Sequence, residues 1–367
     1  MSTERAPIAA RRAYIDWVRG AAVLVMIEAH TLDAWTRPGD RAGLAFQMLT
    51  VLGGFAAPLF LWLAGLGLAL SATRMVDRTG SRSAAAGALV RRGGWIFLLA
   101  FLFRLQAFLV SPGSPPVALL KVDILNVMGP ALAAAGLIWC AAPGPRSAVL
   151  GCAGVAAAIA LLTPIVRTSG WVDGLPDWVE RYIRPARERT TFTLFPWSGF
   201  VLAGAAAGTL LAPSRAARSE KTFIGALTAS GAALVAVGFL TASRPPLYAA
   251  SSFWTSSPTF FAIRVGILLL VLGAMFVLRP LAARLPGPFA VLERFGAHSL
   301  FVYWIHVELV YGYATWPIHR SLPLWAAVAA YGLFSAAMYG AVRLQVRVVR
   351  RWRSRGPSGG RASPAPA

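Results

Sequence analysis

The chain has 367 residues, of which 57% are hydrophobic and only 13% are charged, and its mean hydropathy is +0.62. Soluble domains carry about 25% charged residues, so this composition excludes an ordinary soluble protein and indicates a protein of the lipid bilayer. The net charge of +21 would suggest nucleic-acid binding in a soluble chain. Here the basic residues fall in short runs between apolar stretches, so we expect membrane lipids and no nucleic acid as partners.

Ten apolar stretches follow one another along the chain, each close to the 20 or so residues that a spanning helix needs. They predict an all-α, polytopic bundle of about ten transmembrane helices. The predicted spans are 16–36, 44–72, 89–110, 122–142, 147–166, 193–212, 222–242, 259–279, 295–315 and 322–345. In the sixth of them, Gly204 and Gly208 form a small-xxx-small pattern that is typical of close helix packing.

Arginine and lysine are distributed unevenly between these stretches. Most of them fall in segments that share a side with the N-terminus and the C-terminal tail, and such residues mark the cytoplasmic side. We therefore expect a cytoplasmic N-terminal segment, 1–15, a transmembrane domain, 16–345, and a basic, disordered cytoplasmic tail, 346–367. The expected location is the plasma (inner) membrane, with the chain as a multi-pass protein.

The first predicted helix carries ionisable side chains at a depth where they are costly. At 100° per residue, Asp16, Arg19 and His30 fall on one stripe, with Arg19 and His30 about 16 Å apart along the axis. Asp33 lies one turn beyond His30 and is a better candidate for its partner than Glu28, which points away. Either His30 takes part in chemistry, or it only hydrogen-bonds a neighbouring helix.

Two later helices repeat this pattern of polar residues in apolar surroundings. Arg104, in the third span, requires an anion or a carboxylate. Asp123, at the start of the fourth, is a candidate partner, and the alternative is that Arg104 lines a substrate cavity. Arg264, early in the eighth span, faces the same two alternatives. His306 and Glu308 place two ionisable groups in one short span, the ninth, which is costly, and both a functional and a structural role stay open for them.

Several segments, in order along the chain, resemble the helices of one known family of membrane proteins. They are the D-W-x-R-G run that begins at Asp16, APLFLWLAGLGLALS (57–71), VDILNVMGPAL (122–132), FTLFPWSGFVLAGAAAG (192–208) and HSLFVYWIHVELVYG (298–312). Their succession resembles the heparan-α-glucosaminide N-acetyltransferase-like proteins, which belong to a wider superfamily of transmembrane acyltransferases. The region 16–345 is accordingly expected to be an acyltransferase-like domain.

The resemblance implies transfer of an acyl group, usually acetyl, from a coenzyme A thioester to a hydroxyl or amine of a saccharide. Acyl-CoA is then a co-substrate, the saccharide is the acceptor, and no cofactor is bound permanently. The family's presumed catalytic histidine maps onto His30. Bacterial relatives often place an acid directly before that histidine, where this chain has Ala29. The cysteines Cys140 and Cys152 do not form a zinc-binding spacing, so no metal site is predicted.

The residues themselves are compatible with this chemistry. Acyl transfer to an alcohol needs a base, which histidine supplies near neutral pH, and the CoA phosphates need positive charge. The expected catalytic residues are His30, Asp33, His306 and Glu308. The expected donor-binding residues are Asp16, Arg19, Arg104 and Asp123.

Two other functions compete with an acyltransferase. A transporter or flippase for an anionic or saccharide cargo would use buried His, Arg and Glu residues as a relay, although the inverted repeats common in such folds are not detected in this sequence. A non-catalytic scaffold would leave those residues unexplained. The sequence leaves open the acceptor, the membrane face that it approaches from, N- or O-acylation, the acyl chain length and the oligomeric state.

Overall fold

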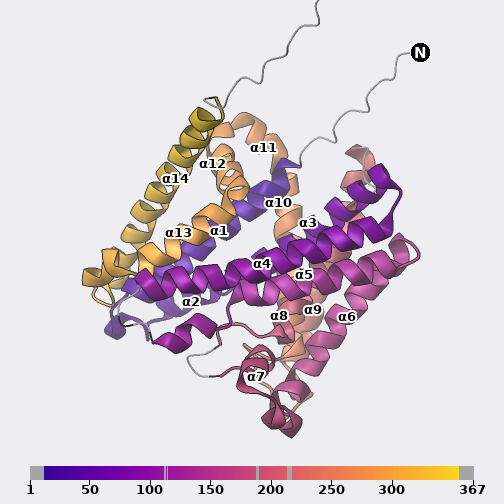
Figure 1. Ribbon diagram of the computed structural model, residues 1–367, viewed down its shortest axis with the longest axis horizontal. Coiled ribbons are helices and arrows are strands. Elements are labelled where there is room, and N and C mark those ends of the chain that lie inside the picture. The colour runs from indigo at the N-terminus through magenta and orange to yellow at the C-terminus, as the bar shows by residue number, and fades with distance from the viewer. Residues whose placement is uncertain (1–11, 111–112, 114, 187–189, 213–216, 355–367) are drawn as a thin grey trace, which may run out of the picture.

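The computed structural model describes residues 12–110, 113, 115–186, 190–212 and 217–354, and within these ranges the protein is helical and contains no strand (Figure 1). The α-helices are α1 (Ala13–Trp35), α2 (Leu44–Gly53), α3 (Ala56–Thr79), α4 (Arg82–Val110), α5 (Ile124–Ala141), α6 (Pro145–Thr168), α7 (Asp177–Ile183), α8 (Leu194–Leu211), α9 (Ala217–Ala242), α10 (Pro258–Val277), α11 (Arg279–Arg284), α12 (Pro286–Ala297), α13 (Ser299–Tyr311) and α14 (Leu324–Ser354). Short 3₁₀ helices cover η1 (Pro38–Asp40), η2 (Pro116–Leu120), η3 (Gly170–Gly174) and η4 (Tyr313–Ile318).

Eight of the described helical segments are long and apolar enough to cross a membrane, which confirms the all-α polytopic fold. The other two predicted spans correspond to α1 and to α12 with α13. Helix α13 is apolar but short, with 13 residues. Helix α1 has the length of a span, but it carries four charged side chains, those of Asp16, Arg19, Glu28 and Asp33.

Two predicted helices are interrupted where continuous spans were expected. The stretch 44–72 breaks after Gly53 into α2 and α3, and 295–315 breaks at His298, whose backbone angles are not helical (φ −116°, ψ 22°). The first break follows from two adjacent glycines, which weaken a helix. A Cβ at Gly53 would lie 2.8 Å from the Cβ of Ala29, so the break lets α1 approach closely.

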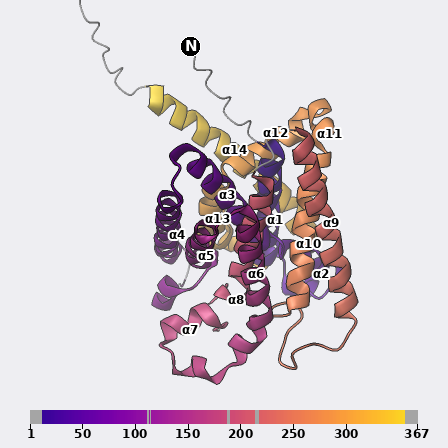
Figure 2. The ribbon, with the colours of Figure 1, turned by 90° about the vertical axis from the view of Figure 1, so that its right-hand side faces the viewer.

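The helices form two groups joined through α1, and the first group consists of α12, α13 and α14. Helix α1 packs against α12, α13 and α14 on one side and touches α3 and α10 on the other. The second group consists of α3, α4, α5, α6 and α8, and the hairpin of α9 and α10 stands at one edge, opposite α4 (Figure 2). The candidate site described below lies between the two groups.

Helices α3 and α8 approach each other at backbone distance. A Cβ at Gly204 would lie 1.9 Å from the carbonyl oxygen of Trp62, and one at Gly65 would lie 1.8 Å from that of Val201. Gly208 is similarly confined, with a Cβ 2.5 Å from the oxygen of Leu66. The close packing predicted from Gly204 and Gly208 is confirmed.

Charged contacts tie the two ends of α1 to other helices. At its start, the carboxylate of Glu220 in α9 accepts hydrogen bonds from Arg12 Nε (2.7 Å) and from the Tyr14 hydroxyl (2.9 Å). At its far end, the following loop is tied to α14, because Asp40 accepts a hydrogen bond from the Leu324 backbone N–H (2.8 Å). This bond holds the pKa of Asp40 below its usual value. Helix α1 is thereby fixed at both ends.

The predicted termini are only partly described. Helix α14 continues to Ser354, through the first residues of the expected tail, whereas 355–367 and the N-terminal residues 1–11 lie outside the described residues. The orientation in the membrane stays a prediction.

Replacement of Gly204 by valine should destabilise the protein by at least about 1–3 kcal/mol, the usual cost of overpacking a core. The reason is that Trp62 presents backbone rather than a movable side chain at this contact. Thermal unfolding of the purified protein in detergent measures the effect. Gly225→Val in α9 is the matched control, since a Cβ there meets nothing within 4 Å. Equal unfolding midpoints for the two variants would contradict the packing argument.

Reporter fusions test the predicted orientation. The distribution of basic residues predicts that fusions after positions 37, 80, 180 and 360 read outside, inside, outside and inside. A cytoplasmic signal at position 180 would overturn this arrangement.

Candidate functional site

A cavity of about 1830 Å³ lies between the two groups of helices and is lined chiefly by α1, α2, α3, α4 and α13. One end holds three arginines from α1, α3 and α4, and we call it the Arg19 end: Arg19, Arg74 and Arg92. The other, which we call the His30 end, holds His30, Asp33, Arg41, Glu308 and Tyr311. Helix α1 runs from one end to the other, so the cavity extends along α1 in the direction that leads from one predicted side of the membrane to the other.

Two histidines from distant parts of the sequence meet at the His30 end. The ring centroids of His30 and His306 are 5.1 Å apart, with the ring planes at 80°. The ring of Tyr311 stands at a similar angle to His30, with 5.6 Å between the centroids. Both histidines are candidates predicted from the sequence, and the structure brings them together.

The hydrogen bonds of His306 define its tautomer. Its Nδ1 lies 2.8 Å from the carbonyl oxygen of Val302 and 3.0 Å from that of Tyr303. Because a carbonyl oxygen can only accept, Nδ1 carries the proton and donates it. The Nε2 atom then has a lone pair, and this atom is buried without a hydrogen-bond partner among the described residues. His306 therefore offers a proton acceptor next to His30.

Asp33 bonds to Tyr311 and Arg41 rather than to His30. Its carboxylate accepts a hydrogen bond from the Tyr311 hydroxyl (2.9 Å) and forms an ion pair with Arg41 (3.4 Å). The Asp33 side chain is 58% exposed. Any influence of Asp33 on His30 therefore passes through the Tyr311 ring or through its charge, and the predicted orienting role stays a prediction.

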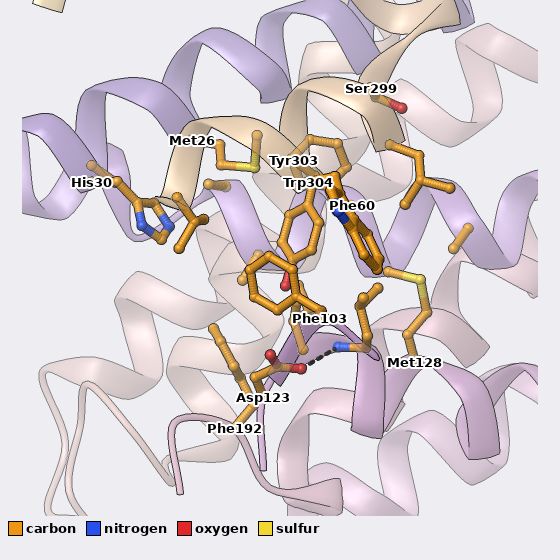
Figure 3. Close-up of a pocket in the computed structure, with 18 of the residues that line it drawn as sticks. Met26, His30, Phe60, Phe103, Asp123, Met128, Phe192, Ser299, Tyr303 and Trp304 are labelled. Atoms are coloured by element: carbon orange, nitrogen blue, oxygen red, sulfur yellow. Dashed lines mark hydrogen bonds between the residues drawn. The ribbon is translucent and has the colours of Figure 1, made fainter. Parts of the chain in front are cut away.

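The predicted pair of Arg104 and Asp123 is formed. Arg104 donates from Nε (3.0 Å) and Nη2 (2.6 Å) to one carboxylate oxygen of Asp123, whose other oxygen accepts from the backbone N–H of Leu125 (3.0 Å). Asn126 accepts from the Asp123 N–H in return, which completes a capping box at the start of α5. Figure 3 shows Asp123 beside Phe103 in the cavity wall. This pair combines helix capping with ion pairing.

Aromatic rings line the middle of the cavity. Phe103 of α4 packs on Tyr303 (centroids 5.1 Å apart) and on Trp304 (5.6 Å) of α13, and Phe60 of α3 lies next to them (Figure 3). These rings separate the Arg19 end from the His30 end and give the cavity apolar walls between two polar ends.

Two cavity carboxylates have no partner. Both oxygens of Glu308 and both oxygens of Glu28 are buried without a hydrogen bond among the described residues. A helical wheel directs Glu28 away from His30, yet both side chains line the cavity. A glutamate at membrane depth was the signal that could have identified Glu28 as a site residue.

At the Arg19 end, the predicted contact between Arg19 and Asp16 is present. Arg19 Nη1 lies 3.0 Å from Asp16 Oδ1, and Asp16 itself is buried. Arg74 and Arg92 line the same end of the cavity. Positive charge thus outweighs negative charge at this entrance, as an anionic ligand requires.

No metal centre is evident in the part of the chain that the structure describes. No group of three or more His, Cys, Asp or Glu side chains there is placed to hold an ion. Cys140 and Cys152 are free thiols.

Comparison with known proteins gives one family. No curated protein matches the chain. The family model described as "Heparan-alpha-glucosaminide N-acetyltransferase, catalytic" matches residues 11–241, from α1 nearly to the end of α9. The matched region is more than half of the chain and contains His30, Arg19 and the Arg104–Asp123 pair, whereas α10 and α13 lie beyond it. The chain therefore belongs to the family of the heparan-alpha-glucosaminide N-acetyltransferase catalytic region.

Proposed function

We propose that this membrane acyltransferase moves an acetyl group from acetyl-CoA to a hydroxyl or amine of a saccharide, with His30 as the general base. The observation that carries the proposal is His30 in the wall of a cavity whose opposite end is lined by arginines, with the ring of the fully buried His306 5.1 Å from it. The family supports the reaction class. The assignment of residues rests on the geometry of this chain.

The proposed step needs one base and no covalent intermediate. The acceptor oxygen or nitrogen attacks the thioester carbonyl carbon, the new C–O or C–N bond forms, and the C–S bond breaks. His30 takes the proton of the acceptor and returns a proton to the departing sulfur, so that CoA leaves as a thiol. His306 has its Nδ1 proton directed at backbone carbonyls, and its free Nε2 keeps an acceptor beside His30.

The arginines at the other end suit the phosphates of the donor. Arg19, Arg74 and Arg92 would hold them by charge-assisted hydrogen bonds. The axial distance from Arg19 to His30, about 16 Å on an ideal helix, is comparable with the reach of a pantetheine arm. The aromatic walls around Phe103 and Trp304 would exclude water from the thioester on its way to His30.

The acceptor would lie at the His30 end. Glu28 and Glu308 offer carboxylate oxygens that no described group occupies, and sugar hydroxyls are good donors to such oxygens. Trp304 and Tyr303 offer flat apolar faces for a sugar ring.

The second candidate remains a transporter or flippase for an anionic or saccharide cargo. A large cavity with polar residues at both ends of α1 is the observation in its favour. Formation of an acetylated saccharide from labelled acetyl-CoA by the purified protein separates the two functions, because a transporter forms no such product.

Substitution of His30 by alanine or glutamine should lower kcat by about 10²–10⁴-fold, the usual contribution of a general base, and leave CoA affinity nearly unchanged. Glutamine keeps the ability to hydrogen-bond but cannot take up a proton at neutral pH. The assay is acetyl transfer to a panel of saccharides. His319→Gln is the matched control, since His319 stacks on Trp316 outside the cavity. If His30→Gln turns over like the unchanged protein, His30 is a packing residue and His306 is the next candidate.

Arg19→Ala should weaken CoA binding in calorimetry, and Arg19→Lys should restore it only in part, because an ammonium group lacks the bidentate fork. Arg284→Ala in α11 is the control for loss of a basic residue outside the cavity. Asp16→Asn isolates the contribution of the Arg19–Asp16 contact. Unchanged CoA affinity in a folded Arg19→Ala protein would remove the donor-binding role.

A further inference from the structure

Arg264 lines the same cavity but plays no part in the scheme above. It lies in the second turn of α10, while His30 lies in the last two turns of α1. These ends of α10 and α1 face the same predicted side of the membrane. Arg264 is therefore placed with the acceptor end of the cavity and away from Arg19, Arg74 and Arg92. It also lies beyond the matched region 11–241, so the family says nothing about it.

Arg264 is in contact with aromatic rings and backbone, and no described carboxylate lies within ion-pair distance of it. Its guanidinium lies 4.1 Å from the ring centroid of Phe260 and 5.8 Å from that of Trp197. Its Nε is buried without a hydrogen-bond partner, and no described carboxylate forms an ion pair with it. The arginines that do have acidic partners, such as Arg104, show how this chain otherwise neutralises a cation within the bundle.

The break between α2 and α3 lies between Arg264 and the nearby carboxylate of Glu28. A Cβ at Gly54 would lie 3.6 Å from Arg264 Nη2, and a Cβ at Gly53 would lie 3.0 Å from Glu28 Oε2. Gly53 and Gly54 thus lie between the guanidinium of Arg264 and the carboxylate of Glu28, which form no ion pair with each other. Ring faces and the negative end of α2 stabilise the cation, but more weakly than an anion would.

A half-buried guanidinium without an acidic partner, in the wall of a cavity, is suited to a planar or tetrahedral oxyanion, which it can hold with two parallel hydrogen bonds. The absence of side chains at Gly53 and Gly54 leaves space for such a group. Arg264 lies at the acceptor end of the cavity. We therefore do not expect it to bind the phosphates of the donor, because the Arg19 end is available to them.

We propose that Arg264 binds an anionic group of the acceptor, a carboxylate, phosphate or sulfate ester, so that the enzyme selects acidic saccharides over neutral ones. This inference rests on the proposed function for the identity of the acceptor. The anion site itself depends only on the cavity and its lining.

Binding of small saccharides to the purified full chain tests the anion site directly. The probes are glucosamine 6-phosphate and glucosamine 6-sulfate, compared with glucosamine. We expect the charged probes to bind at least about tenfold more tightly, as a charge-assisted bidentate contact implies. Arg264→Gln should remove this preference, and Arg264→Lys should keep part of it. Arg244→Gln is the control, because Arg244 is exposed and outside the cavity.

Kinetics then decide which substrate carries the anion. In Arg264→Gln, KM for the charged acceptor should rise about tenfold or more, while KM for glucosamine, KM for acetyl-CoA and kcat stay unchanged. The proposal is overturned if the unchanged protein does not prefer the charged saccharides over glucosamine. It is also overturned if Arg264→Gln keeps that preference. A loss of acetyl-CoA affinity instead also overturns it, because the anion would then belong to the donor. Failure to detect any acetyl transfer would contradict the proposed function, whereas the binding comparison would still decide on the anion site.

Discussion

The cost of placing a charge in the apolar interior of a bilayer is the constraint on which this architecture depends. The chain satisfies it by pairing. Arg104 of α4 bonds to Asp123 at the start of α5, Arg12 bonds to Glu220 of α9, and Arg19 bonds to Asp16 within α1. Three described residues that lack such a partner, Glu28, Glu308 and Arg264, face the same cavity. Departures from local rules that cluster in this way are typical of functional sites.

Features that depend on neighbours along one helix or across a short loop could be predicted from the sequence. The apolar spans, the packing glycines Gly204 and Gly208, and the pair of Arg104 and Asp123 belong to this class. The interruption after Gly53 could not be predicted in the same way, because an apolar window of 18 residues extends across two glycines without a change in hydropathy. The break allows the close contact of Gly53 with Ala29 of α1, and such a contact between distant segments is not visible in a local stretch of sequence.

The site itself was predicted residue by residue but not as an arrangement. His30 and His306 were both candidates, yet their contact joins helices at opposite ends of the chain, and no local pattern encodes it. Glu28 was set aside because a helical wheel describes one helix at a time, whereas the cavity is shaped by several. The matched region contains His30 and ends before His306, so it is the structure that reveals the contact between the two rings.

The double role of Asp123 has an evolutionary consequence. Its carboxylate neutralises Arg104 and also caps the first turn of α5, so a mutation there changes the cavity charge and weakens a helix at once. Arg264 has no such second duty, since its described contacts are with ring faces. Substitutions at Arg264 can therefore accumulate with little loss of stability. If Arg264 binds the acceptor as proposed, a change of acceptor can arise at α10 while the α4–α5 corner stays unchanged.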